Sequence, residues 1–405
     1  MKDKIQNIKI QDYDYTLPEQ RIAKYPLAKR DASKLLLYNK GNISETLFAD
    51  IGSFMPHKSL LVFNNTKVIQ ARLMFNKTTG AAIEIFCLSP YEPSDYSDVF
   101  AQHHSCVWLA MLGNLKKWKE GKLSKTLIIE GEEFTLWAEN MGKEGEAHKI
   151  KFSWNNERFC FAQIIENLGE LPIPPYLNRK TETEDLERYQ TIYSKAKGSV
   201  AAPTAGLHFT GELIESLKNQ GVACQEICLH VGAGTFKPVK SVEIGGHSMH
   251  AECFTIEKER LSAIISHLGN IIAVGTTAVR TLESLYYIGL LINDNPDISQ
   301  ENLHVDQWIP YETDAELPVA DALQHIVDYL QSKQLQSITC YTRIMIVPSF
   351  KFKLVKGIIT NFHQPQSTLL LLISAFVGED WHRIYEYALT HDFRFLSYGD
   401  SSLLI

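Results

Sequence analysis

The sequence has no apolar segment long enough to cross a membrane. Its longest apolar run extends from Leu369 to Val377, broken only by Ser374, and is far shorter than the ~20 residues that a membrane-spanning helix needs. The first 15 residues carry charges and amides in place of the apolar stretch of a signal peptide, and they lack the Arg and Ser bias of a transit peptide. We therefore expect a cytoplasmic protein that makes no contact with a membrane.

Cysteines are few and show no pairing pattern. The seven cysteines are odd in number, scattered along the chain and without a CxxC pair, which argues against a disulfide framework and a zinc ribbon. Cys224 and Cys228 lie on one face of an expected strand, where packing in the core is favoured over metal binding. The sequence predicts reduced cysteines and no metal cofactor.

Positive charge is also in short supply, because the formal net charge is −7. Sequence-independent binding of nucleic acid requires a basic surface, so this class of function is disfavoured. A local basic face remains open, although a single cluster is more often a solvated surface than an RNA contact. The candidate clusters are Lys24, Lys29, Arg30 and Lys34, then Lys116, Lys117, Lys119 and Lys122, and finally Lys351, Lys353 and Lys356.

The apolar pattern divides the chain into two kinds of structure. Between Arg72 and Phe152, short alternating runs separated by Gly and polar turns predict strands without helices, as in a small β-barrel or sandwich. From Glu157 onward strands and helices alternate, which is typical of an α/β layered domain. We expect an α/β fold, with a three-layer αβα core domain of residues 1–70 and 156–405 and a small all-β barrel domain inserted at residues 71–155.

Individual elements can be placed in the α/β part. An apolar strand at Leu60–Phe63 runs into an Asn-Asn turn and a second short strand. Residues 290–340 are predicted to be irregular apart from one amphipathic helix at 320–333. Further strands are expected at 221–231, 270–275 and 357–360, and further helices at 258–268, 278–291 and 367–378.

The segment SVAAPTAGLHF, residues 199–209, is the densest candidate for chemistry. Its small residues and proline hold a tight backbone that presents Thr204, Gly206 and His208. Glycine loses much backbone entropy on folding, so its presence is explained if a ligand approaches the backbone closely. A helix start packed tightly against a sheet explains it equally well.

The segment LHVGAGTF, residues 229–236, follows an expected strand. Gly232 and Gly234 would expose backbone N–H groups at the carboxyl edge of the sheet, where open α/β sheets bind ligands. The third glycine and the following helix of a dinucleotide fingerprint are missing, which argues against that kind of site. His230 is either a ligand contact or, more commonly for such a position, a strand histidine with satisfied hydrogen bonds.

The segment IIAVGTTAVRTLES predicts a strand, a turn at Thr276-Thr277 and a helix with Arg280 in its first turn. Helix N-termini attract anions, and a guanidinium adds a bidentate contact, so a carboxylate or phosphate is the expected ligand. The alternative is that Thr277 caps the helix and Arg280 forms an exposed ion pair with Glu283.

Three other segments carry candidate groups. Asn361 and His363 follow a strand in a polar loop, and Ser367 is a plausible N-cap for the next helix. The segment HSMHAE, residues 247–252, predicts a proton relay or, less readily, a metal site without an obvious third ligand. Asp400 lies in a turn with Tyr398 and Gly399, close to the C-terminus.

Taken together, these segments resemble the S-adenosylmethionine:tRNA ribosyltransferase-isomerase family of queuosine biosynthesis, and the similarity extends over nearly the whole chain. Long motifs in the family's order and near its spacing make a chance similarity improbable. The segments are KYPLAKRDASKLL, LLVFNNTKVIQARL, LPIPPYLNR, YQTIYS, SVAAPTAGLHFT, LHVGAGTFKPV, HSMHAE, IIAVGTTAVRTLES, TNFHQPQSTLLLLISAFVG and FRFLSYGD.

The resemblance implies an α/β domain with an inserted β-barrel, a monomer and a tRNA partner bound by its anticodon stem-loop. It also implies that S-adenosylmethionine is the co-substrate, without a metal, and that its ribosyl group is transferred to 7-aminomethyl-7-deazaguanine and isomerised. Histidines and carboxylates suit the proton transfers, and the candidates are His208, His230, His363 and Asp400. The implied S-adenosylmethionine-binding residues are Thr204, Gly206, Gly232, Gly234, Thr276, Thr277, Arg280 and Asn361.

The chain departs from the family pattern in several places. Ser349 replaces the glycine of a Tyr-Pro-Gly step, Lys356 replaces an acidic residue, Gln364 replaces a leucine, and Gln70 replaces a proline. Residues 290–340 are also longer than usual. A paralogue that acts on another acceptor and a non-catalytic RNA-binding descendant therefore stay open, whereas an ordinary methyltransferase is disfavoured because its glycine-rich loop is missing.

Overall fold

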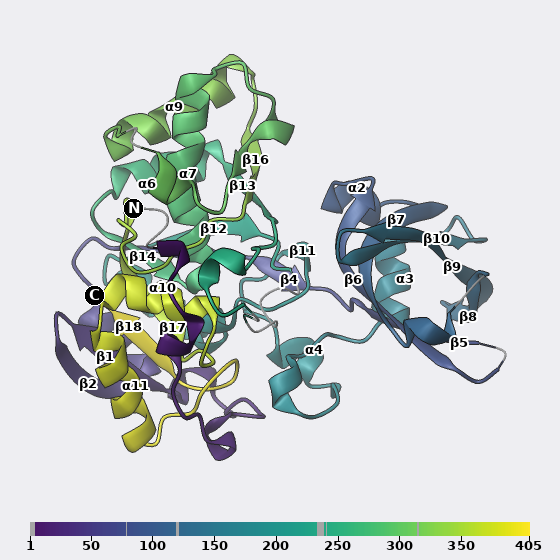
Figure 1. Cartoon of the computed structure of the whole chain (residues 1–405), viewed down its shortest axis with the longest axis horizontal. Coiled ribbons are helices and arrows are strands. Elements are labelled where there is room, and N and C mark those ends of the chain that lie inside the picture. Colours follow the sequence, from purple (N-terminus) through teal and green to yellow (C-terminus); the bar gives the residue numbers. More distant parts are fainter. Residues whose placement is uncertain (1–4, 78, 119–120, 233–238, 240, 314–315) are drawn as a thin grey trace.

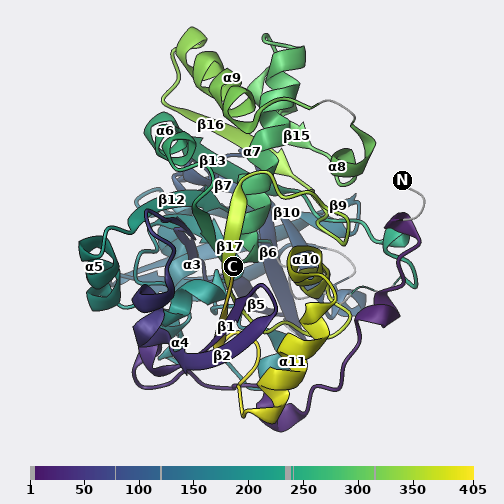
Figure 2. The same ribbon diagram turned by 90° about the vertical axis from the view of Figure 1, so that its left-hand side faces the viewer.

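The computed structural model describes residues 5–77, 79–118, 121–232, 239, 241–313 and 316–405. It contains a ten-stranded sheet, a six-stranded sheet and a short two-stranded sheet. The six-stranded sheet occupies one end of the long axis (Figure 1), and it lies behind the larger sheet in the view along that axis (Figure 2). Within these residues no helix is both long and apolar enough to span a membrane.

The ten-stranded sheet takes strands from both ends of the chain. Its central strands β12 (Ala223–Leu229), β3 (Leu60–Asn64), β14 (Ile271–Val274) and β17 (Val355–Asn361) are parallel neighbours in that order. Every residue of β3 and β14 is buried, as expected for parallel strands covered on both faces. The flanking strands are β13 (Glu252–Glu257), β16 (Ser337–Thr342) and β15 (His304–Val305) beside β12, and β18 (Ser401–Leu404), β1 (Lys34–Asn39) and β2 (Asn42–Leu47) beside β17.

Helices pack against both faces of this sheet. Side chains alternate along a strand, so Leu60 and Val62 belong to one core cluster and Leu61 and Phe63 to another. The second cluster includes α5 (Gly211–Asn219). The first includes α6 (Lys258–Ser266), α7 (Thr276–Asp294), α9 (Val319–Ser332), α10 (Thr368–Val377) and α11 (Asp380–Thr390).

The six-stranded sheet is antiparallel throughout and nearly closes into a barrel. Its order is β5 (Arg72–Asn76), β6 (Ala82–Glu92), β7 (Ser105–Gly113), β10 (Ala147–Trp154), β9 (Glu132–Glu144) and β8 (Leu123–Ile129). The end strands approach each other, because Lys125 Nζ of β8 donates to the Met74 carbonyl of β5 at 3.1 Å. Its separate core contains Trp108 and Phe152 and extends to Phe161 in α3 (Phe161–Leu168).

Short elements complete the chain. Strands β4 (Thr66–Val68) and β11 (Ala196–Ser199) pair in parallel and lie between the two large sheets (Figure 1). The remaining helices are α2 (Tyr96–Phe100), α4 (Asp185–Arg188) and α8 (Ile309–Glu312).

The expected strands and helices are present, and the prediction of a mixed α/β fold with an inserted, barrel-like β-sheet is confirmed. The structure adds elements that the apolar pattern did not indicate, among them β1, β2, β13, β18, α5 and α11, and it places β16 across the end of the stretch predicted to be irregular. The strands among them lie toward the two sides of the sheet, where one long apolar run is not required. The prediction of strands without helices between Arg72 and Phe152 is wrong at α2, a single short helix.

Gly289 is where α7 meets α9 most closely. A Cβ at this position would lie 2.0 Å from the Ala322 carbonyl oxygen. We expect Gly289→Ala to lower the free energy of unfolding by about 2 kcal/mol, although alanine in a helix is favoured over glycine by about 1 kcal/mol. Denaturant unfolding measures the change. Gly211→Ala in α5 is the control, since a Cβ there meets no other atom within 4 Å, and equal stability of both variants would contradict the close contact.

Candidate functional site

A cavity of about 730 Å³ lies at the carboxyl ends of the central parallel strands. Val231 follows β12, Gly275–Thr277 follow β14, and Thr360–Gln364 end and follow β17. This is the edge at which open α/β sheets bind ligands. The remaining wall consists of Tyr176, Tyr189, Ala201, Ala202, Pro203, Thr204, Ala205, Ser367, Leu369, Leu396 and Ser397.

The cavity brings together residues predicted from three separate segments. Thr204 comes from the 199–209 segment, Thr276 and Thr277 from the start of α7, and Asn361 and His363 from the end of β17 and the loop after it. Ser367 caps α10 as predicted, because its hydroxyl accepts from the Leu370 N–H at 3.2 Å.

The start of α7 presents hydrogen-bond donors to this cavity. The N-cap is Gly275, at φ +89, and it supplies no side-chain cap. Thr277 Oγ1 is buried and has no hydrogen-bond partner among the described residues, so the interpretation of Thr277 as the helix cap is wrong. Free N–H groups, the helix dipole and an unpaired hydroxyl together favour an anion or a polar ligand here.

Arg280 is buried in the first turns of α7 but does not line the cavity. Its Nη1 forms an ion pair with Glu252 Oε2, and its Nε donates to the Ile344 carbonyl at 3.2 Å. The alternative pairing with Glu283 is wrong, because Glu283 accepts from the backbone N–H groups of Lys353, Leu354 and Val355. Glu252, the carboxylate of the HSMHAE segment, is therefore committed to Arg280.

His363 lies in the wall of the cavity beside Thr360. Its Nε2 is 2.9 Å from Thr360 Oγ1, and its backbone N–H donates to the Tyr385 hydroxyl at 3.0 Å. Burial lowers the pKa of His363 to about 3, so the imidazole is uncharged at neutral pH.

His208 is buried directly behind Asn361. Its Nδ1 is 2.8 Å from Ser33 Oγ, and its Nε2 is 3.2 Å from Asn361 Nδ2. Asn361 Nδ2 also donates to the Leu396 carbonyl at 3.0 Å, which fixes the orientation of the amide. Burial lowers the pKa of His208 to about 4, so its Nε2 can accept from Asn361 at neutral pH. Asn361 Oδ1 is left without a partner among the described residues.

A second, smaller cavity of about 300 Å³ lies on the other side of His208. Ser397 lines both cavities. The smaller one is lined by Pro26, Leu27, Arg30, Ser33, Arg188, Leu207, His208, Arg394, Ser397, Tyr398 and Gly399.

Two of the predicted catalytic residues line neither cavity. His230 stacks on Tyr96 of α2, with ring centroids 3.8 Å apart, and its Nε2 is 3.6 Å from Cys228 Sγ. Burial lowers the pKa of His230 to about 4. Asp400 accepts from the backbone N–H groups of Lys34 and Arg394 and pairs with the Arg394 guanidinium at 2.9 Å, so it joins β1 to the C-terminal turn.

Gly206 and Gly232 are not among the residues that line the larger cavity. A Cβ on Gly206 would lie 1.9 Å from the Tyr193 hydroxyl oxygen, so the close approach at this glycine is made by a tyrosine of the chain itself. Gly232 directly follows the cavity residue Val231, and Gly234 lies outside the described residues. No group of three or more His, Cys, Asp or Glu side chains in the described part of the chain is arranged to hold a metal.

Sequence reasoning gave no role to Tyr176, Tyr189 or Ser397, which all line the larger cavity. The Tyr176 hydroxyl and Ser397 Oγ are 2.6 Å apart. The two tyrosines belong to the segments LPIPPYLNR and YQTIYS, and Ser397 belongs to FRFLSYGD. The high density of aromatic and polar residues in these segments could have indicated that they contribute to a binding site.

The departures from the family pattern lie in different environments. Gln364 lines the larger cavity, whereas Gln70 lies beside α3, near the carbonyl of Ile165. Lys356 is an exposed residue of β17. Ser349 adopts φ +84, a left-handed conformation that favours glycine, so the backbone keeps a glycine-like conformation although the residue is serine.

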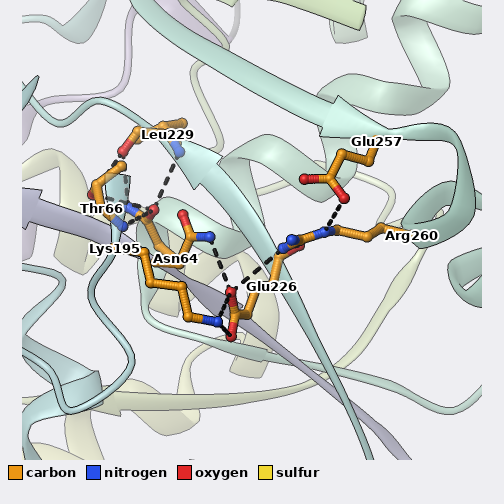
Figure 3. A network of polar contacts seen from close by, with 8 residues as sticks. Asn64, Thr66, Lys195, Glu226, Leu229, Glu257 and Arg260 are labelled. Carbon is orange, nitrogen blue, oxygen red and sulfur yellow. Dashed lines mark hydrogen bonds and ion pairs between the residues drawn. The ribbon is translucent and has the colours of Figure 1, made fainter. Parts of the chain in front are cut away.

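A polar network fixes the end of β12 beside the cavity (Figure 3). Asn64 Oδ1 accepts from the Leu229 N–H at 3.1 Å, and Asn64 Nδ2 donates to the Leu229 carbonyl at 2.9 Å. Thr66 Oγ1 donates to the same carbonyl at 3.1 Å. Nearby, Glu226 accepts from Lys195 Nζ at 2.8 Å. The Asn64 amide thus takes the place of a backbone partner for Leu229, two residues before the cavity residue Val231.

Known proteins resemble this chain over nearly its whole length. A family model described as queuosine biosynthesis protein matches residues 10–404. A relative from Sulfurihydrogenibium sp., named S-adenosylmethionine:tRNA ribosyltransferase-isomerase, is 36% identical over 405 residues, which cover 98% of this chain and 100% of the relative. A relative of the same name from Treponema denticola is 34% identical over 400 residues, covering 97% and 99%.

Among solved structures, a crystal structure of S-adenosylmethionine tRNA ribosyltransferase from Thermotoga maritima is 27% identical and covers 97% of this chain and 100% of its own, with a TM-score of 0.45. The sequence matches alone carry the assignment, and they confirm the resemblance seen in the motifs. The chain belongs to the queuosine biosynthesis protein family.

Proposed function

We propose that this chain is an S-adenosylmethionine:tRNA ribosyltransferase-isomerase. It transfers the ribosyl group of S-adenosylmethionine to 7-aminomethyl-7-deazaguanine at the tRNA wobble position and isomerises it. The products are epoxyqueuosine-tRNA, adenine and methionine. The observation that carries the proposal is the similarity, over the full length of both chains, to relatives that bear this name.

The larger cavity is the proposed site for S-adenosylmethionine. Its wall combines aromatic and apolar side chains with a few polar groups, as ligand pockets do. The N-terminus of α7, with Thr276 and Thr277, suits the carboxylate of the methionine part. Asn361 Oδ1 suits an amino group, because it is an unpaired acceptor whose amide is held by Leu396 and His208.

His363 is the proposed proton-transfer group in that cavity. A sulfonium acidifies the neighbouring C–H bonds, so a positioned base can remove a proton, and adenine leaves more readily when it is protonated. Of the four predicted catalytic residues, His363 alone lines the larger cavity among the described residues. His208 then acts through Asn361 as a positioning residue, and Asp400 supports the turn that carries Ser397.

The proposal extends to the domains and the partner. We assign residues 1–70 and 156–405 to a three-layer αβα core and residues 71–155 to the inserted barrel. The separate apolar core of the barrel supports two units, although this core also takes in Phe161 and Ile165 of α3, beyond the proposed boundary. The partner is the anticodon stem-loop of tRNA, and its support is the tRNA in the relatives' name. Monomeric state and cytoplasmic location remain predictions.

The direct test incubates the pure protein with S-adenosylmethionine and tRNA that carries 7-aminomethyl-7-deazaguanine. We expect free adenine and an epoxyqueuosine nucleoside, both detected by mass spectrometry. Adenine without the nucleoside would mean that the chain uses another acceptor. The absence of both products, with tRNA still bound, would favour a non-catalytic RNA-binding protein.

Thr277→Val tests the proposed S-adenosylmethionine site. Valine keeps the shape of threonine and removes only the unpaired hydroxyl, so we expect unchanged stability and roughly fivefold weaker binding of S-adenosylmethionine. Equilibrium dialysis measures the Kd. Thr126→Val, at an exposed position of β8, is the control, and equal Kd values for both variants would remove Thr277 from the site.

The neutral state of His208 predicts a pH dependence of stability. The pKa of His208 is about 4 in the folded chain and ~6.5 when unfolded, so its contribution is complete above pH ~6.5 and is lost as the pH falls through about 4. This loss is roughly 3 kcal/mol. Urea unfolding across this range should show a shallower pH dependence for His208→Gln than for the wild type. His57→Gln, at an exposed position, should keep the wild-type slope.

A further inference from the structure

The smaller cavity is lined by three arginines, Arg30, Arg188 and Arg394. Only Arg394 forms an ion pair with a carboxylate in the described residues, namely with Asp400. Arg30 and Arg188 form none, although each is only partly exposed. Guanidinium groups keep their charge under all ordinary conditions, so the cavity carries two positive charges without a fixed counterion.

Backbone carbonyls are the partners of these two side chains. Arg30 donates to the carbonyls of Gln190 at 2.7 Å, Glu187 at 3.1 Å and Leu207 at 3.3 Å. Arg188 donates to the carbonyls of Ala28 and Leu27, and its buried Nε has no acceptor among the described residues. Carbonyl dipoles orient the guanidinium groups but do not neutralise them, and further N–H donors remain on both.

The electrostatics of the two side chains agree with this geometry. Burial and the positive charge of Arg188 lower the pKa of Arg30, against smaller opposing effects that include the Glu187 carboxylate. His208, the remaining titratable base in the wall, is uncharged at neutral pH because burial lowers its pKa to about 4. Holding like charges together out of water is costly, and a bound anion removes that cost.

On this basis we propose that the smaller cavity binds a backbone phosphate of the RNA substrate, with Arg30 and Arg188 as its ligands. The inference rests on the proposed function, which supplies an RNA whose target base must reach the neighbouring larger cavity. Ser397 lines both cavities, and the side chain of His208 separates them by its contact with Asn361. A phosphate here would therefore hold the backbone next to the reacting base.

The other anion in the reaction is the carboxylate of S-adenosylmethionine. The smaller cavity has less than half the volume of the larger one, in which the whole S-adenosylmethionine molecule is proposed to bind. The start of α7 already presents donors for a carboxylate in the larger cavity. Arginine pairs are well matched to phosphate, because the planar fork binds two oxygens at once.

The test measures the binding of tRNA to the full chain between about 50 and 200 mM salt. We expect Arg30→Gln and Arg188→Gln each to weaken binding roughly tenfold and to reduce the slope of log K against log salt by about 1. The Kd for S-adenosylmethionine should stay at the wild-type value. Arg158→Gln is the control, because this exposed arginine lies beyond β10 of the barrel and pairs with Glu130.

Leu27 offers a second pair of variants that leaves the arginines and their hydrogen bonds intact. Leu27→Glu would place a carboxylate in the cavity and compete with a phosphate, whereas Leu27→Gln adds a side chain of the same size without charge. We expect only Leu27→Glu to weaken tRNA binding. This pair decides the question even if the loss of either arginine unfolds the chain.

Each outcome separates this inference from the proposed function. Wild-type slopes in the arginine variants, or equal effects of Leu27→Glu and Leu27→Gln, would overturn the phosphate site while product formation by the wild type continues. If the arginine variants bind S-adenosylmethionine more weakly but bind tRNA as the wild type does, the cavity holds the carboxylate of S-adenosylmethionine. That result would also overturn the phosphate site. A wild type that binds tRNA with the expected slope but forms no product would leave the phosphate site standing and refute the proposed reaction.

Discussion

The parallel pairing of β12, β3, β14 and β17 is the constraint on which the site depends. Hydrogen bonds between parallel neighbours bring their carboxyl ends to one edge of the sheet, although the strands are far apart in the sequence. The segments that follow three of them, at Val231, Gly275–Thr277 and Asn361–His363, therefore meet in one cavity. At the end of β3, the side-chain amide of Asn64 forms hydrogen bonds with both backbone groups of Leu229, so the contact between β3 and β12 continues beyond the paired backbones.

Buried polar groups give this edge its precise geometry. The Asn361 amide nitrogen has His208 Nε2 and the Leu396 carbonyl as acceptors, and His208 is in turn bound to Ser33 beside β1. Hydrogen bonds have preferred directions, so this chain orients Asn361 more strictly than apolar packing would. The groups left unpaired, Asn361 Oδ1 and Thr277 Oγ1, belong to residues of the cavity wall, where a ligand can supply what the protein does not.

Net charge and local charge diverge in this protein. The whole chain is acidic at −7, yet Arg30 and Arg188 come together without carboxylate partners in the described residues. They belong to segments more than 150 residues apart, and each is oriented by carbonyls of the other's segment, as the contacts of Arg30 with Glu187 and of Arg188 with Ala28 show. The net charge of the chain does not reveal such a site, because the free energy of binding an anion depends on the few charges nearest to it.

The sequence by itself determined the fold class, most of the helices and strands, and the family. Apolar periodicity is a local property, so it indicated the buried β3, the alternating strands of the barrel and α7. The motifs also indicated Thr204, Thr276, Thr277, Asn361 and His363, which converge on one cavity.

Only the tertiary structure decided that His208 lies behind Asn361, that Arg280 pairs with Glu252, and that Gly206 makes room for Tyr193. It also decided that β18 completes the sheet at the C-terminus. These partners are distant in the sequence, and a residue's own neighbours carry no information about which distant group will fill the space beside it.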